Sequence, residues 1–288
     1  MSDEKQAHRR RSVLFMPASN PRAMAKARDL SCDAVILDLE DAVAPAAKAE
    51  ARGAALSAAA QGFGARDCAV RINALDTPWG RDDAGALADA RGVAAAVVPK
   101  VGSADDLRAV RAVLGDDGPP IWAMIETCGA VLRLGDIVDA AGETRTELLI
   151  AGTNDLAKEM RCRPGVARDP LVPVLVQMVV AARSAGLIVL DGVCNAIREP
   201  ERLAAECAQG AMLGFDGKTL IHPGQIDAAN AAFGPSAEEL DWARAVVAAF
   251  AAPEAAGFGA IQLEGAMVER LHLAEAERVL GLAGSGVG

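Results

Sequence analysis

Short apolar runs alternate along this chain with longer stretches of helical apolar spacing. Short runs rich in β-branched residues predict strands, whereas apolar residues that recur every three or four positions predict amphipathic helices. The predicted strands lie at residues 12–17, 34–41, 68–73, 94–101, 121–127, 147–155, 186–193 and 210–218. The stretches between them, such as PRAMAKARDL and SADDLRAVRAVLG, are rich in good helix formers.

The order of these elements predicts the fold class. The strand runs are apolar on both faces, which is typical of a parallel sheet covered on both sides. Eight alternations of strand and helix within 288 residues predict a (β/α)8 TIM barrel, which we expect to span residues 1–235. An open doubly wound sheet is the alternative, but no G-x-G-x-x-G follows the first strand to support a dinucleotide site.

The remaining residues predict an extension of the barrel. The stretches AEELDWARAVVAAFAAPEAAG and GAMVERLHLAEAERVLGLA predict two helices, and FGAIQLEG between them predicts a short loop or hairpin. No change of composition and no linker marks an independent second domain. We therefore expect residues 236–288 to form a C-terminal helical extension that packs on a neighbouring subunit.

Composition and charge narrow the possible partners. A hydrophobic fraction of 52% is ample for a buried core, and a formal charge of −10 opposes binding to nucleic acid or anionic lipid. The start, MSDEKQAHRRR, has no apolar segment behind it, and no apolar run approaches the roughly 20 residues that span a bilayer. The sequence thus predicts a cytoplasmic protein with neither a nucleic-acid nor a membrane partner. Six cysteines without a C-x-x-C pair predict reduced thiols, and three dispersed histidines give no zinc pattern.

Polar residues follow most of the predicted strands. In a barrel, the carboxyl ends of the strands open onto one face, where such residues converge. A single charged residue at a strand end is explained as a helix N-cap or a first loop residue, but seven charged strand ends predict a polar pocket. The residues are Asp38, Glu40, Asp41, Arg71, Asn73, Lys100, Glu126, Asn154, Asp155, Asp191, Asp216 and Lys218.

Glu126 and Asp155 are the candidate metal ligands. They follow the apolar runs of consecutive strands, so their carboxylates are expected to meet at the rim. Two carboxylates with open water positions suit Mg²⁺, and the absence of a neighbouring histidine disfavours Zn or Fe. The alternative is that each carboxylate pairs with Lys100, Lys158 or an arginine.

Arg71 is the candidate anion-binding residue. It lies within an apolar strand, where an unpaired guanidinium is costly, so it requires a carboxylate partner. Glu40 or Asp41 can supply that partner, and a substrate carboxylate can equally do so. We group Arg71, Glu40 and Asp41 as candidate substrate-binding residues.

Several long motifs resemble one enzyme family. They are RSVLFMPASNP, AVILDLEDAVAPAAKAEAR, VRINALDTPWG, VVPKV, MIET, GTNDLAKEM and GFDGKTLIHPGQI. In this order, from about residue 9 to about residue 280, the chain resembles the citrate lyase β-subunit-like branch of the HpcH/HpaI aldolase and malyl-CoA/citramalyl-CoA lyase superfamily.

The resemblance implies a TIM barrel in which Glu126 and Asp155 hold Mg²⁺ and Arg71 holds the carboxylate of a 2-oxo acid. It also implies that coenzyme A, as part of the substrate, contacts five residues: Phe15, Arg22, Lys26, Ile221 and His222. Arg22 and Lys26 lie four apart on a predicted helix, which suits phosphate oxygens but equally fits a solvated basic face.

The resemblance further implies a reaction and a proton donor. Relatives cleave a β-hydroxyacyl thioester of malyl-CoA or citramalyl-CoA type into acetyl-CoA and a 2-oxo acid, or run the reverse condensation. Their proton donor is an aspartate in a C-terminal G-x-M-V-D stretch of a neighbouring subunit. Here the stretch is GAMVERL, which substitutes Glu269 and places Leu271 where a proline is common.

Three activities remain open from the sequence. The main expectation is a Mg²⁺-dependent carbon–carbon lyase. The first alternative is hydrolysis, as a malyl-CoA thioesterase or a malate-synthase-like enzyme. The second is a citrate lyase subunit or non-catalytic homologue that acts with an acyl-carrier-protein partner. The resemblance implies a homo-oligomer, either a trimer or a hexamer.

Overall fold

The computed structural model describes residues 9–252 and 257–284 of the chain. The chain divides into two compact units, one spanning Arg10–Phe233 and the other combining Met1–Arg9 with Gly234–Gly288. Each unit is described separately below. None of the helices in the described residues is long and apolar enough to cross a membrane.

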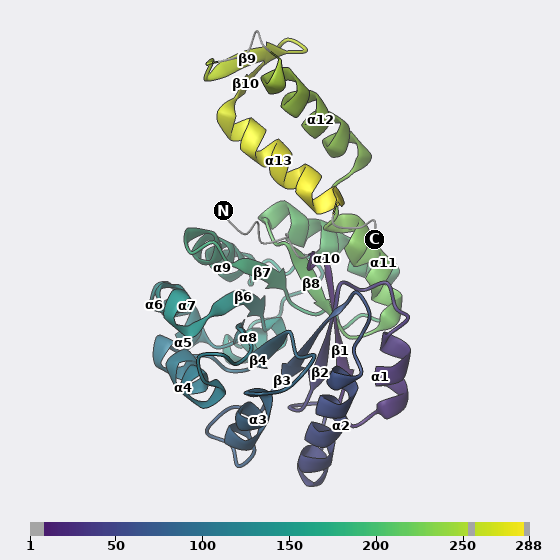
Figure 1. The fold of residues 1–288 in the computed structure, drawn as a ribbon, viewed down its shortest axis with the longest axis vertical. Coiled ribbons are helices and arrows are strands. Elements are labelled where there is room, and N and C mark those ends of the chain that lie inside the picture. The colour runs from purple at the N-terminus through teal and green to yellow at the C-terminus, as the bar shows by residue number, and fades with distance from the viewer. Residues whose placement is uncertain (1–8, 253–256, 285–288) are drawn as a thin grey trace. The chain divides into compact units, whose positions relative to one another are not determined.

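The larger unit is a closed barrel of eight parallel strands, as predicted (Figure 1). The strands follow the chain order around the barrel, and β1 closes it by pairing with β8, where Val13 lies opposite Thr219. Their bounds are β1 Ser12–Pro17, β2 Ala34–Asp38, β3 Asp67–Arg71, β4 Ala95–Val98, β5 Ile121–Ile125, β6 Thr146–Ala151, β7 Ile188–Asp191 and β8 Gly217–Leu220.

Helices surround the strands on the outside of the barrel (Figure 1). The longer ones are α2 Lys48–Ala60, α3 Gly80–Leu87, α4 Ala104–Leu114, α9 Val172–Ser184 and α10 Pro200–Leu213. The shorter ones are α1 Pro21–Ala27, η1 Pro45–Ala47, α5 Cys128–Leu132, α6 Leu134–Asp139, α7 Ala141–Thr144, α8 Thr153–Glu159, η2 Pro223–Gln225 and α11 Ile226–Ala232.

Two apolar layers account for strands that are apolar on both faces. The first layer fills the barrel interior, and the second lies between the strands and the helices. Alternate residues of one strand divide between them: on β5, Trp122 and Met124 belong to the interior, whereas Ile121 and Ile125 face the helices. The interior layer contains Val13, Ala34, Ile36, Ala69, Ala95, Val97, Trp122, Met124, Leu148, Ile150 and Leu190.

The eighth strand differs from the prediction. The apolar run 210–218 was expected to be one strand, but its first residues complete α10, which ends at Leu213. Gly214, in the left-handed conformation at φ 96°, caps this helix, and β8 begins only at Gly217. Asp216 therefore precedes β8 and Lys218 lies within it, so the prediction that both lie at the carboxyl end of this strand was wrong.

The smaller unit contains two helices and a hairpin. Helix α12 Ala237–Ala251 begins at a capping box formed by Ser236 and Glu239, and α13 spans Arg270–Gly284. Between them, β9 Ala260–Leu263 and β10 Ala266–Glu269 pair antiparallel. The two helices were predicted, and of the short loop or hairpin expected between them the hairpin is observed, but Ala266–Glu269 was assigned to the second helix and is a strand.

A separate small core holds this unit together. Ala243 and Val246 of α12 pack with Val268 of β10 and Ala276 of α13. Because these side chains come from three elements, the hairpin and both helices share one apolar cluster.

Candidate active site

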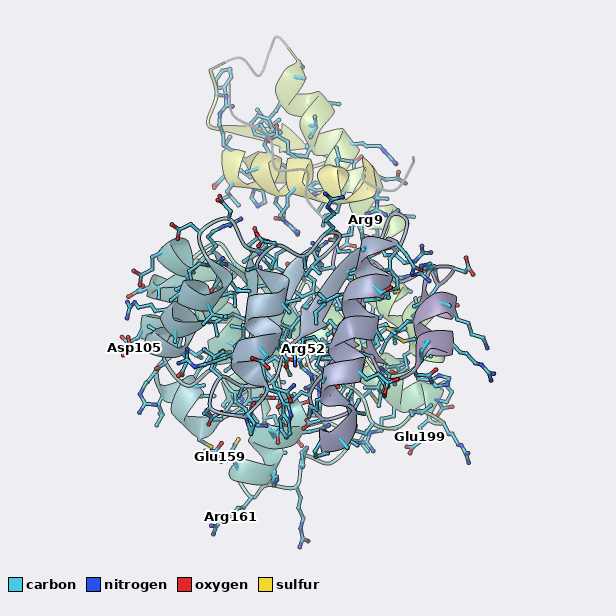
Figure 2. The ribbon with its side chains drawn as sticks, turned by 60° about the horizontal axis from the view of Figure 1, so that its bottom comes forward. Arg9, Arg52, Asp105, Glu159, Arg161 and Glu199 are labelled. Atoms are coloured by element: carbon cyan, nitrogen blue, oxygen red, sulfur yellow. The ribbon has the colours of Figure 1, made fainter. Side chains whose placement is uncertain are left out.

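A cavity of about 410 Å³ opens at the carboxyl ends of the barrel strands. Exposed charged side chains surround this end of the barrel, and Figure 2 shows Glu159 and Arg161 near the end of α8 and Glu199 before α10 along its lower edge. The cavity is lined by Phe15, Pro17, Asp38, Asp41, Ala42, Arg71, Met124, Glu126, Ile150, Ala151, Gly152, Thr153, Asn154, Asp155, Val193, Thr219 and Ile221.

Arg71 is held mainly by Asp38. Its Nε and Nη2 donate to the two carboxylate oxygens of Asp38 at 2.6 and 2.7 Å. Nη1 lies 2.8 Å from Oε2 of Glu40 and 3.9 Å from Asp41. Of the two protein partners that the sequence suggested, Glu40 is therefore the close one, but the principal partner is Asp38. A substrate carboxylate remains a proposal.

The surroundings of Arg71 keep it charged. Burial lowers the pKa of Arg71, but the hydrogen bonds with Asp38 and the charges of Asp38, Glu40 and Asp41 outweigh this effect and raise it. The guanidinium carbon also lies 4.9 Å from the centre of the Phe15 ring, a favourable cation–π distance. A permanently charged guanidinium thus faces the cavity.

Lys100 joins two of the acidic side chains. Its Nζ donates to Oε1 of Glu40 at 2.8 Å, and its backbone N–H donates to Oε1 of Glu126 at 2.6 Å. The backbone of Lys100 is left-handed at φ 54°, an uncommon conformation for a residue other than glycine. Burial raises the pKa of Glu40, although Arg71 and Lys100 oppose this.

Glu126 and Asp155 both line the cavity, one after β5 and the other in the first turn of α8. Burial, together with the charges of Glu40 and Asp155, raises the pKa of Glu126 to about 7, although the Lys100 N–H and the Arg71 charge act in the opposite direction. Among the described residues, neither carboxylate forms an ion pair with a lysine or arginine side chain. The pairing that the sequence left open as the alternative to metal binding is therefore not seen.

Gly152 makes room for Glu126. A Cβ atom at Gly152 would lie 2.2 Å from Cβ of Glu126 and 2.7 Å from its Oε2. Real Cβ atoms do not approach so closely, so only glycine fits here while Glu126 keeps this position. Packing of β6 against β5 therefore fixes where the Glu126 carboxylate lies.

The cavity and its immediate surroundings carry an excess of acid. Five carboxylates, from Asp38, Glu40, Asp41, Glu126 and Asp155, face two cationic side chains, from Arg71 and Lys100. Among the described residues, Oε2 of Glu40 is buried and lacks a hydrogen-bond donor, even though Arg71 is near. Asp38, Glu40 and Glu126 are buried, whereas Arg71 is the buried cation beside them, and this excess of buried acid favours a bound cation.

The donor set fits Mg²⁺ in particular. In the described part of the chain, no three His, Cys, Asp or Glu side chains gather closely enough to hold a metal by themselves. Mg²⁺ usually takes only one or two protein carboxylates and keeps several water ligands. Glu126 and Asp155 match that requirement, whereas zinc and calcium sites need more protein ligands.

Several predicted site residues lie outside the cavity lining. Arg22 and Lys26 are exposed on α1, and Nδ1 of His222 accepts a hydrogen bond from the backbone of Gly224, which caps η2. Ile221 does line the cavity. Glu269 is an exposed residue at the end of β10, in the smaller unit.

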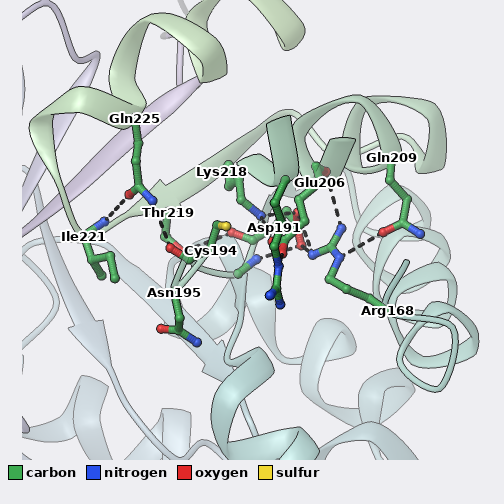
Figure 3. A network of polar contacts seen from close by, with 12 residues as sticks. Arg168, Asp191, Cys194, Asn195, Glu206, Gln209, Lys218, Thr219, Ile221 and Gln225 are labelled. Atoms are coloured by element: carbon green, nitrogen blue, oxygen red, sulfur yellow. Dashed lines mark hydrogen bonds and ion pairs between the residues drawn. The ribbon is translucent and has the colours of Figure 1, made fainter. Parts of the chain in front are cut away.

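Asp191 and Lys218 form a buried network instead of lining the cavity (Figure 3). Nζ of Lys218 lies 2.7 Å from Asp191 and 3.4 Å from Glu206, and Arg168 lies 2.8 Å from Asp191. In the sequence, Asp191 and Lys218 are charged residues at the ends of apolar strands, and we therefore expected both at the rim of the barrel. Asp216 pairs with Arg183, away from the cavity lining.

Comparison with known proteins supplies the classification. The model of the HpcH/HpaI aldolase/citrate lyase family matches residues 11–223, which covers the whole strand order of the barrel. The chain belongs to the HpcH/HpaI aldolase/citrate lyase family. The resemblance found in the sequence motifs is thereby confirmed.

Individual members of the HpcH/HpaI family differ in their names. The (3S)-malyl-CoA thioesterase of Cereibacter sphaeroides (strain KD131) is 45% identical to this chain, and the match covers 96% of each. Citrate lyase subunit beta of Escherichia coli (strain K12) is 32% identical over 97% of this chain and 95% of its own. CitE of Mycobacterium tuberculosis, solved with magnesium, acetoacetate and coenzyme A, is 33% identical to this chain. The two structures match with a TM-score of 0.76 over 97% of this chain and 99% of the CitE chain.

Proposed function

We propose that this protein is a Mg²⁺-dependent enzyme that hydrolyses a coenzyme A thioester of malyl-CoA type. The observation that carries the proposal is the meeting of Glu126, Asp155 and Arg71 in one acid-rich cavity. The full-length similarity to a (3S)-malyl-CoA thioesterase supports hydrolysis over the carbon–carbon cleavage that the sequence motifs first suggested.

In this proposal the cavity holds the acidic end of the substrate. Glu126 and Asp155 would hold Mg²⁺, which when bound supplies a Lewis acid that polarises substrate oxygens. Arg71 would bind the substrate carboxylate, because Asp38 uses only part of its five N–H donors. Asp38 and Glu40 would keep the guanidinium in place for that contact.

The chemical step needs only water as a second reactant. The water oxygen bonds to the thioester carbonyl carbon, the carbon–sulfur bond breaks, and the sulfur leaves as a thiol after taking up a proton. The products are free coenzyme A and a hydroxy diacid. Phe15, Arg22, Lys26, Ile221 and His222 would contact coenzyme A, as the family resemblance implies.

Carbon–carbon cleavage is the second candidate. Its support is the similarity to citrate lyase subunits and to CitE, which was solved with magnesium, acetoacetate and coenzyme A. In this case Glu269 would protonate the enolate of acetyl-CoA from a neighbouring subunit. Met267 and Leu271, which are 73% and 63% exposed on either side of Glu269, would then pack on that subunit in a trimer or hexamer.

Product analysis decides between the two candidates. Purified protein is incubated with malyl-CoA and with citramalyl-CoA, with and without Mg²⁺, while free thiol, hydroxy diacid and 2-oxo acid are quantified. Hydrolysis predicts Mg²⁺-dependent thiol and hydroxy diacid in equal amounts without 2-oxo acid. Release of glyoxylate or pyruvate with acetyl-CoA would instead establish the lyase.

The variant Glu269→Gln separates the candidates further. Loss of an enolate-protonating acid lowers lyase turnover by about a hundredfold, with Glu277→Gln on the exposed face of α13 as the matched control. If protein that binds Mg²⁺ releases neither product from either thioester, both proposals are wrong.

A further inference from the structure

A buried glutamine connects two loops at the carboxyl end of the barrel (Figure 3). Gln225 is 2% exposed and uses both ends of its amide. Its Oε1 accepts from the backbone N–H groups of Ile221 and His222 at 3.0 and 3.2 Å, and its Nε2 donates to the carbonyl oxygen of Cys194 at 2.9 Å. These hydrogen bonds link the turn after β8, at residues 221–225, to the loop after β7, at residues 192–195. We call this link the tie.

The loop after β7 in turn contacts the turn that carries Asp155. A Cβ atom at Gly192 would lie 2.3 Å from Oγ1 of Thr153 and 2.6 Å from the carbonyl oxygen of Ala151, so only glycine fits where this loop packs against the β6 turn. Further along the loop, Nδ2 of Asn195 donates to Oδ1 of Asn154 at 2.6 Å. Thr153 and Asn154 directly precede Asp155, so both contacts hold the turn that carries the candidate metal ligand.

The base of this loop is fixed. The side chain of Asp191 is fully buried between Lys218 and Arg168, and its carbonyl oxygen accepts from Oγ1 of Thr219 at 3.0 Å. A loop that starts from an immobile residue and is tied at Cys194 has few ways to shift. A displacement at the β8 turn is therefore passed on to the β6 turn.

We propose that Gln225 is a positioning residue that sets the separation between the thioester end of the site, at Ile221 and His222, and the metal end, at Asp155. The assignment of these two ends rests on the proposed function, whereas the tie between the loops does not. Gln225 touches neither end of the substrate itself. It acts through the backbone of residues 192–195.

The variant Gln225→Glu tests the tie selectively. At a pH high enough to ionise the buried carboxyl, it still accepts from Ile221 and His222, but it has no hydrogen to donate to Cys194 and repels that carbonyl oxygen. We expect kcat to fall at least about tenfold, because a shift of about 1 Å costs up to about a hundredfold in rate. KM for the thioester and Kd for Mg²⁺ should stay within about threefold, since each end stays intact by itself.

Gln61→Glu is the matched control. Gln61 also accepts through its side-chain oxygen, from Arg28, and donates through its nitrogen, to Oγ of Ser57, but it lies at the end of α2 and is not part of the tie. Its kcat should remain within about twofold of wild type. An equal fall in kcat in both variants, or an unchanged kcat in Gln225→Glu, would overturn the proposal.

Amide hydrogen exchange gives a readout that needs no substrate. In Gln225→Glu, backbone amides of residues 193–197 and 153–156 should exchange about tenfold faster, whereas those of β2 should not change. Faster exchange in a protein that turns over no thioester would leave the tie standing while the proposed function fails. If Gln225→Glu does not fold, Asn195→Ala, at an exposed position, must show the same exchange pattern around Asn154; unchanged exchange there refutes the tie.

Discussion

Asp38 and Arg71 are register partners on the neighbouring parallel strands β2 and β3, and their side chains join through two hydrogen bonds of 2.6 and 2.7 Å. Residues in register on parallel strands point to the same side of the sheet, so this pairing follows from how the two strands align. The ion pair is buried, with side-chain exposures of 10% for Arg71 and 3% for Asp38.

Breaking this pair should destabilise the protein. Asp38→Ala leaves the buried guanidinium with Glu40 and the more distant Asp41, so the free energy of unfolding should fall by about 3–5 kcal/mol. Urea unfolding measures the loss. Asp105→Ala removes one of the two partners of Arg108 at a site where both side chains of the pair are at least half exposed, and it should cost less than about 1 kcal/mol. Equal losses in the two variants would contradict the prediction.

The raised pKa of Glu126 predicts that its ionised form, which would bind the metal, lowers the stability of the metal-free protein. Its pKa rises from the ordinary 4.5 to about 7, so without metal its contribution to stability is fully present below pH 4.5 and is lost as the pH rises through 7. The lost contribution is about 3 kcal/mol. Metal-free Glu126→Gln should therefore unfold at a higher temperature than wild type at pH 8 but at a similar one near pH 4.

Mg²⁺ should reverse the order of the two melting temperatures at pH 8, so that wild type unfolds at a higher temperature than Glu126→Gln. It stabilises wild type by binding only the folded state, and it should leave the melting temperature of Glu126→Gln unchanged. Thermal melts with Mg²⁺ and with a chelator measure both effects. A variant that gains as much stability from Mg²⁺ as wild type would exclude Glu126 as a ligand.

Gly152→Ala should disturb the site by steric contact alone. The backbone at Gly152 has φ −85°, which alanine adopts without strain, but the new Cβ would overlap Glu126. We expect Mg²⁺ affinity to fall at least about tenfold and stability to fall by about 1–3 kcal/mol. Calorimetric titration measures the affinity. Gly142→Ala, at a helical position with open space, is the control and should leave Mg²⁺ affinity unchanged.

The buried network around Lys218 predicts a compensating pair of substitutions. Lys218→Met leaves Glu206 buried and Asp191 with Arg168 alone, so it should cost about 3–5 kcal/mol. Glu206 then keeps only Arg202, 3.4 Å away, as an ionic partner, so adding Glu206→Gln should restore part of the lost stability. Chemical unfolding of the single and double variants measures the coupling; strictly additive effects would show that Lys218 and Glu206 do not interact.

The pattern of apolar residues in the sequence was sufficient to predict most of the barrel strands. Seven strands were predicted within a few residues because parallel barrel strands are buried on both faces and form continuous apolar runs. The eighth was misplaced because an apolar helix end, Gly210–Leu213, runs into an apolar strand, and an apolar run alone does not separate the two. The same ambiguity hid β10 within an apparent helix.

The site was predictable in part. Glu126 and Asp155 were identified because they follow apolar runs, and Arg71 because a charged residue within an apolar strand is conspicuous. The structure brings all three to one cavity. Asp38 was noticed as a strand end but not as the partner of Arg71, because register is not visible in one strand. Gln225 lies within the motif GFDGKTLIHPGQI but was not singled out, because an amide in a polar turn looks like any loop residue.

The sequence by itself determined the barrel, its family and the acidic residues available at the strand ends, because these depend on local patterning and on motifs that are continuous in the chain. Only the tertiary structure decided which charges meet. Asp191 and Lys218 were expected at the rim but pair inside the protein, whereas Glu126 keeps a raised pKa beside Glu40 and Asp155. Pairing and burial depend on strand register and helix packing, which join residues far apart in sequence.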